Sequence, residues 1–321
     1  MQLDPLVINR HFERHLKSGA FGLMSSKQTF SDILLLLGLW LVWGYSWVAS
    51  KVGLAFATPL QMAAYRLSFA VLTLGLLLLW RRGSLRPPPL WPTLWLGLTQ
   101  TTGFTLLSTW ALLNAGTGKV TILCYTMPFW TLLLARIFLR EQLRPQQWAA
   151  VSLAFVGLMC VLEPWLGGSW VGELLAIGAG ICWAISAIIA KRLRGQHQVD
   201  TLNLTFWQLL LGLVPLYLFL FAVEQPAVNW HATFWLVLIF NGCIAAGLGW
   251  LVWLHLLSRF SAGTAGLNVL AIPAVALLCA WLQLGDTPSL AEGIGIALIA
   301  VALGMMATMS YLLDRAVVSN Q

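Results

Sequence analysis

The nine residues Trp43–Lys51, WGYSWVASK, recur in the second half of the chain as WAISAIIAK at Trp183–Lys191. The two copies share a tryptophan, a serine three residues later and a lysine eight residues later, at a shift of 140 residues. Further matches follow in the same order in both halves: Arg66 with Gln208, and Pro128 with Pro273. Several matches in one order indicate an internal repeat.

The repeat lies within ten apolar stretches, each about as long as a helix that crosses a bilayer, which needs about 20 residues. Hydrophobic residues make up 59% of the chain and charged residues only 9%. We expect an all-α membrane protein with ten transmembrane helices and with tails at 1–31 and 312–321. The expected spans are 32–52, 61–80, 91–114, 118–139, 146–162, 172–193, 201–223, 233–257, 262–283 and 290–311.

Each copy of the repeat holds five of these spans, the first at 32–162 and the second at 172–311. Because five is odd, the second copy has to enter the membrane from the opposite side. This predicts two inverted five-helix repeats, an arrangement found in secondary transporters.

The net charge of +7 is explained by orientation in the membrane. With a cytoplasmic N-terminus, 15 of the 18 Lys and Arg residues fall in cytoplasmic segments, which is the positive-inside pattern. We therefore expect a multi-pass protein of the cell (inner or plasma) membrane with both termini cytoplasmic, and no nucleic-acid partner.

The sequence offers no sign of a cofactor or a metal. It has no G-x-x-x-x-G-K-[ST] loop and no metal-ligand spacing, and its cysteines lie apart within expected spans, as packing residues do. The cysteines are Cys124, Cys160, Cys182, Cys243 and Cys279.

These motifs also resemble a known family. The Trp43-Gly44-Tyr45-Ser46 stretch with Lys51, the Arg66 helix, the stretch from Tyr125 to Trp130 followed by Glu141, and the Trp207-Gln208 pair are similar to the EamA-type branch of the drug/metabolite transporter superfamily. The resemblance covers roughly residues 32–312. It implies ten helices around a central cavity, and its members move amino acids, nucleosides, sugars and other solutes.

The third span carries an unusual number of hydroxyl groups. Thr101, Thr105 and Ser108 lie at i, i+4 and i+7 and share one helix face. This face is typical of a cavity wall, although the hydroxyls could instead bond back to carbonyls four residues earlier or join neighbouring helices.

Pro128 and Pro273 lie near the middle of the fourth and ninth spans, where proline breaks a helix. Paired broken helices point to a site at the membrane midplane, and the alternative is that both prolines only shape packing. Other candidates for the substrate path lie at matching or deep positions in the spans: Trp43, Ser46, Tyr125, Trp183, Ser186 and Gln208.

Arg66 is a charge placed clearly inside a span. Such a cation is costly in lipid and has to meet a carboxylate, backbone carbonyls or an anionic substrate group. Alternatively, it reaches the outer interface and pairs with Glu163, Glu173 or Glu224. Its repeat partner Gln208 is neutral, so the two half-sites differ in charge.

Together these features predict a secondary transporter, an exporter of small organic metabolites such as amino acids, that works by alternating access. Its expected partners are a small-molecule substrate and the lipid bilayer, and a homodimer is left open. One alternative is an intramembrane enzyme that uses Ser46 and His255, and another is a membrane scaffold without flux. The serine lacks the following small residue of a hydrolase motif, so we expect no enzyme.

Overall fold

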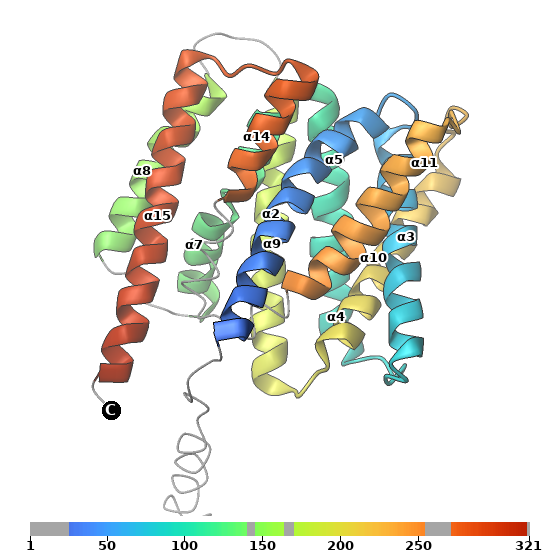
Figure 1. Ribbon diagram of the computed structural model, residues 1–321, viewed down its shortest axis with the longest axis horizontal. Helices are drawn as coiled ribbons and strands as arrows, with labels where there is room; N and C mark the ends of the chain where they lie inside the picture. Colours follow the sequence, from blue (N-terminus) through green and yellow to red (C-terminus); the bar gives the residue numbers. More distant parts are fainter. Residues whose placement is uncertain (1–25, 140–144, 164–169, 254–270, 320–321) are drawn as a thin grey trace, which may run out of the picture.

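Every regular element in the computed structural model is a helix, within the residues that it describes: 26–139, 145–163, 170–253 and 271–319. The first half contains α2 (Ser26–Gly53), α3 (Pro59–Trp80), α4 (Leu90–Leu96), η1 (Gly97–Gly103), α5 (Phe104–Asn114), α6 (Thr117–Cys124), α7 (Met127–Leu139) and α8 (Pro145–Leu162). The second half contains α9 (Val171–Gln196), α10 (Thr201–Ala222), α11 (Ala232–Leu238), η2 (Ile239–Leu248), α14 (Ala271–Leu284) and α15 (Leu290–Ser319). Figure 1 shows them as one bundle of elongated helices.

Within the described ranges, seven helical stretches are long and apolar enough to cross a membrane: Leu34–Gly53, Pro59–Trp80, Thr117–Phe138, Pro145–Leu162, Val171–Arg194, Thr201–Ala222 and Ala232–Trp253. Two shorter apolar helices, Ile272–Leu284 and Leu290–Met305, follow them. The expected third span forms a continuous helix over α4, η1 and α5. It is not among the seven because its hydroxyl and amide side chains lower its hydropathy.

The first and last helices extend beyond the expected spans. Helix α2 begins at Ser26, six residues before the expected start at 32, and α15 continues to Ser319, past 311. Neither extension contains glycine or proline, and a helix does not have to end where its apolar residues end. His255 and the expected junction between the eighth and ninth spans lie outside the described residues.

The expected fourth span is broken in two. Helix α6 ends at Cys124 and α7 begins at Met127, which leaves Tyr125 and Thr126 between them. Pro128 is the second residue of α7, and Pro273 is the third residue of α14. Proline fits the first turn of a helix because a backbone N–H at that position has no partner within the helix, so its loss costs no hydrogen bond. The break therefore lies just before Pro128.

Two π-helices occupy corresponding positions in the two halves. Helix α4 (Leu90–Leu96) runs into η1 (Gly97–Gly103), and α11 (Ala232–Leu238) runs into η2 (Ile239–Leu248). Helix α11 begins 142 residues after α4 does, and η2 begins 142 residues after η1 does. The repeat therefore extends to the local geometry of the backbone.

The halves pack against each other reciprocally. Helix η1 packs against α10, and η2 packs against α3. A Cβ atom added at Gly97 would lie 2.7 Å from the carbonyl oxygen of Gln208, and one added at Gly242 would lie 2.6 Å from the carbonyl oxygen of Arg66. Since Arg66 and Gln208 are the residues that the sequence repeat pairs, each half makes the same close contact with the other. Helices α8 and α15 lie side by side as a further pair (Figure 1).

Candidate functional site

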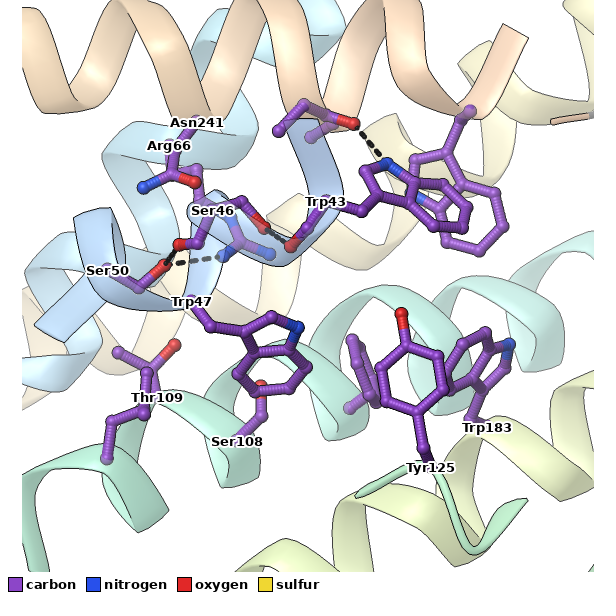
Figure 2. Close-up of a pocket in the computed structure, with 15 residues that line it drawn as sticks. Trp43, Ser46, Trp47, Ser50, Arg66, Ser108, Thr109, Tyr125, Trp183 and Asn241 are labelled. Carbon is purple, nitrogen blue, oxygen red and sulfur yellow. Dashed lines mark hydrogen bonds between the residues drawn. The ribbon is translucent and has the colours of Figure 1, made fainter. Parts of the chain in front are cut away.

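A small cavity of about 70 Å³ lies between the two halves (Figure 2). Helices α2, α3 and α5 contribute residues from the first half, and α9 and η2 contribute residues from the second. The residues that line it are Trp43, Ser46, Trp47, Ser50, Arg66, Phe104, Ser108, Thr109, Leu112, Tyr125, Trp183, Asn241, Ala245, Ala246 and Trp250.

Aromatic rings from both repeats form one wall of the cavity. The ring centroids of Trp43 and Trp250 are 5.2 Å apart, and those of Trp183 and Tyr125 are 5.4 Å apart. Trp183 also lies 6.5 Å from Trp250, and the indole Nε1 of Trp43 donates to the carbonyl of Ala245 at 2.9 Å. These edge-on contacts fix the rings, so Trp43 and its repeat partner Trp183 belong to one wall.

Polar groups of α2 and α3 form the opposite side (Figure 2). Ser46 Oγ donates to the carbonyl of Trp43 at 2.7 Å, and Ser50 Oγ donates to the carbonyl of Ser46 at 2.8 Å. Arg66 Nη1 donates to Ser50 Oγ at 3.3 Å. Arg66 Nε is buried and has no hydrogen-bond partner among the described residues. The guanidinium therefore retains donors that the protein itself does not use.

The charge of Arg66 has no carboxylate partner within the described part of the chain. Two of the acidic residues considered for it, Glu163 and Glu173, lie instead 3.9 Å and 3.5 Å from the ammonium of Lys119. A cation that borders a cavity without a counter-charge is suited to bind an anionic group.

Asn241 is a cavity residue that the sequence reasoning missed. It lies in η2 and is only 1% exposed. With its amide turned to match its neighbours, the nitrogen donates to the carbonyl of Ser46 at 3.1 Å and the oxygen accepts from the N–H of Ser50 at 3.3 Å. The signal was an amide within the apolar run Ala232–Trp253, since polar groups inside a membrane span often mark functional sites.

The candidate residues from the sequence divide into two groups. Those that line the cavity are Trp43, Ser46, Arg66, Ser108, Tyr125 and Trp183. Those that do not line it are Thr101, Thr105, Pro128, Ser186, Gln208 and Pro273.

The third span combines the roles considered for it, and Thr109 Oγ1 also donates back to the carbonyl of Thr105 at 2.6 Å. Thr101 Oγ1 donates to the carbonyl of Gln208 at 3.2 Å, and Thr102 Oγ1 donates to that of Gly212 at 2.6 Å, so this part joins η1 to α10. One to two turns further on, Ser108 and Thr109 line the cavity. Ser186 differs from its partner Ser46 because it faces η1, where its Oγ lies 3.2 Å from Oε1 of Gln100.

No group of three or more His, Cys, Asp or Glu side chains in the described ranges is placed to hold a metal ion. The polar side-chain groups of the cavity are hydroxyls, indole N–H groups, one amide and one guanidinium. Such a set can bind and orient an organic solute through hydrogen bonds and charge.

The repeated bundle of apolar helices around an aromatic and polar cavity defines a multi-pass membrane protein. The EamA-like transporter family matches the chain twice, at residues 30–163 and 170–308. The chain belongs to this family. The family and the names of its relatives indicate a transporter rather than an enzyme.

Several relatives match over most of their length. An uncharacterized transporter, YoaV, from Bacillus subtilis (strain 168) is 27% identical over 85% of this chain and 95% of that protein. A probable amino-acid metabolite efflux pump from Salmonella typhimurium is 27% identical over 87% of this chain and 94% of that protein. A solved crystal structure matches with a TM-score of 0.64 and 21% identity over 88% of this chain and 99% of that one, which shows the fold alone.

Proposed function

We propose that the protein is a secondary transporter that exports small organic metabolites, amino acids among them, by alternating access. In this proposal ten helices form two inverted five-helix repeats, and the cavity between them binds the solute. The reciprocal packing of η1 on α10 and of η2 on α3 supports the inversion. Two related halves can rock against a site at their interface, so that it faces each side in turn.

The observation that carries the proposal is the position of Arg66. Its guanidinium, which pairs with no carboxylate in the described ranges, lies against a cavity that both halves line. A carboxylate would pair with its free donors, while the Trp43, Tyr125 and Trp183 rings would contact an apolar part of the solute. This favours solutes that carry a carboxylate.

The size of the cavity supports movement of the halves. Its volume of about 70 Å³ is well below the roughly 300–1,000 Å³ of typical ligand pockets. A metabolite therefore fits only after the walls separate, as alternating access requires.

The amino-acid class and the outward direction are supported by relatives named as probable amino-acid metabolite efflux pumps in Salmonella typhimurium and Escherichia coli. Basic residues gather at the end of the bundle that we assign to the cytoplasm, in keeping with the positive-inside rule. Arg81 and Arg82 follow α3 there, and Lys191 and Arg192 lie near the end of α9. Both termini are then cytoplasmic in the inner or plasma membrane.

The direct test is transport by purified protein in proteoliposomes. We would measure the flux of amino acids, nucleosides and sugars, with and without a pH gradient, against protein-free liposomes. Flux of carboxylated solutes above that of the protein-free liposomes supports the proposal. Absence of flux for every class, with correctly folded protein, would contradict it.

Ser46→Ala separates transport from the enzymatic alternative. The Ser46 hydroxyl donates to the carbonyl of Trp43, and its proposed base, His255, lies outside the described residues. We expect the variant to retain transport with about a two- to twelvefold change in apparent affinity, because one neutral hydrogen bond contributes about 0.5–1.5 kcal/mol. Complete loss of activity in a folded variant would instead indicate a nucleophile. Concentration-dependent uptake in proteoliposomes is the measurement.

A further inference from the structure

The hydroxyl groups of the cavity use their hydrogens within the protein. Ser46 Oγ and Ser50 Oγ each donate to a backbone carbonyl three or four residues earlier on α2. On α5, Ser108 Oγ and Thr109 Oγ1 both donate to the carbonyl of Thr105, at 3.1 Å and 2.6 Å. A hydroxyl has one hydrogen and two lone pairs. In this arrangement each of these oxygens can therefore only accept a hydrogen bond from a solute.

The charged donors toward a solute come from Arg66. Its Nη1 donates to Ser50 Oγ at 3.3 Å, which leaves Nε and the other N–H groups for a solute. A guanidinium binds a carboxylate through two parallel N–H···O bonds. Because Ser46 and Ser50 lie beside Arg66 (Figure 2), a carboxylate bound there brings its neighbouring atoms against oxygens that accept.

This arrangement of donors and acceptors lies within one half of the protein. Ser46 and Ser50 belong to α2, Arg66 to α3 and Thr109 to α5, and all three helices lie in the first family match. The hydrogen bonds described above join residues of this half to one another. Movement of one half against the other can therefore enlarge the cavity and keep the arrangement intact.

The charge around the cavity is positive. No residue that lines the cavity in the described ranges is acidic, and residues 254–270, outside those ranges, contain no Asp or Glu. A second cation, Lys51, donates to the carbonyl of Leu112, which lines the cavity, and to that of Ala115. Asp286 attracts Lys51 but borders a separate pocket, so the positive charge beside the cavity is not balanced by it.

We propose that the preferred solutes are carboxylates that carry a neutral hydrogen-bond donor, an O–H or an amide N–H, on the carbon next to the carboxylate. Such solutes are 2-hydroxy acids and N-acylated amino acids. This inference rests on the proposed transport function and narrows its substrate class.

The ammonium of a free amino acid would occupy the same place as the neutral donor. Its charge would then lie beside the Arg66 guanidinium, with no acidic residue among the described lining residues to balance it. Like charges at short range repel each other, most strongly in a weakly solvated site. A neutral donor binds the acceptor oxygens without this repulsion, so free amino acids bind less tightly than their acylated forms.

The test compares four solutes that share one apolar side chain and differ only at the carbon next to the carboxylate. They are 2-hydroxy-4-methylpentanoate, N-acetylleucine, leucine and 4-methylpentanoate, which carry there an O–H, an amide N–H, an ammonium and hydrogen alone. The carboxylate of each is ionised at about pH 7. Dissociation constants are measured by titration calorimetry on the purified full chain in detergent, so the result does not depend on flux.

We expect the hydroxy acid and the acetylated amino acid to bind at least about tenfold more tightly than leucine. They should also bind about two- to twelvefold more tightly than 4-methylpentanoate, which offers no donor. Equal or tighter binding of leucine would overturn the role of charge. Equal binding of 4-methylpentanoate would overturn the role of the acceptor oxygens, and absence of binding by all four to folded protein would overturn the inference as a whole.

A matched pair of variants at Ser50 isolates the charge. Ser50→Asp places a carboxylate within reach of Arg66, whose Nη1 lies 3.3 Å from the native hydroxyl. It should reduce the preference for N-acetylleucine over leucine to less than about twofold. Ser50→Asn has nearly the same shape without the charge and should keep a preference of about tenfold. The same preference in both variants would show that the charge of Arg66 does not set it, and melting temperatures check that both fold.

Transport of the same four solutes in proteoliposomes separates this inference from the function on which it rests. Binding with the expected preference but without flux would contradict transport alone. Flux of all four solutes without the preference would contradict the inference alone.

Discussion

Arg66→Gln is expected to lower transport of carboxylated solutes by about 10- to 100-fold while changing transport of neutral solutes by less than about threefold. A hydrogen bond to a charged group contributes about 1.5–3 kcal/mol, which corresponds to that range. Glutamine keeps a neutral donor but removes the charge and the paired donors that hold a carboxylate. The measurement is initial uptake in proteoliposomes of amino acids and of their uncharged amide and ester analogues.

Two further variants control for charge in general. Arg66→Lys keeps a positive charge but loses the planar fork, so it should recover part of the carboxylate transport. Arg82→Gln removes an exposed arginine that follows α3 and should leave both classes of solute unchanged. Equal loss for charged and neutral solutes in Arg66→Gln would show that the arginine supports the fold rather than the solute.

The sequence repeat predicted which positions correspond, but it could not predict which of them face the cavity. Ser46 and Ser186 show the difference. Each hydroxyl donates to the carbonyl of the tryptophan three residues earlier, at 2.7 Å in both cases. Only Ser46 lines the cavity, because η1 brings Gln100 against Ser186. Which way a polar residue of a membrane helix faces depends on which helices pack beside it, and a single sequence does not show that arrangement.

The π-helices are a second feature that the sequence did not reveal. Their backbone pairing differs from that of an α-helix by one residue, and the same residue types are compatible with both. In the folded bundle, η1 makes contacts with another helix, such as those of Thr101 and Thr102 with carbonyls of α10. By contrast, the sequence predicted that Trp43 and Trp183 lie near the interface of the two halves. Large side chains at matching, deep positions of two repeats face the site between them.

Gly242→Ala is expected to destabilise the protein by about 2 kcal/mol or more, because overpacking of a tight contact costs about 1–3 kcal/mol. An added methyl group would lie 2.6 Å from the carbonyl oxygen of Arg66 and 2.4 Å from Cβ of Phe69. One of these neighbours is backbone, so the strain is relieved only if η2 moves away from α3. That movement would displace Asn241 and Arg66 together, and we therefore expect transport to fall along with the melting temperature in detergent.

Gly38→Ala is the matched control, because a methyl group added at Gly38 on α2 meets nothing within 4 Å. Alanine is favoured over glycine in a helix by about 0.5–1 kcal/mol, so this variant should raise the melting temperature slightly and keep full transport. The opposite signs of the two changes separate helix propensity from packing. If Gly242→Ala were as stable as Gly38→Ala, η2 and α3 could not be in such close contact. The inverted repeat would then be supported only by the packing of η1 on α10.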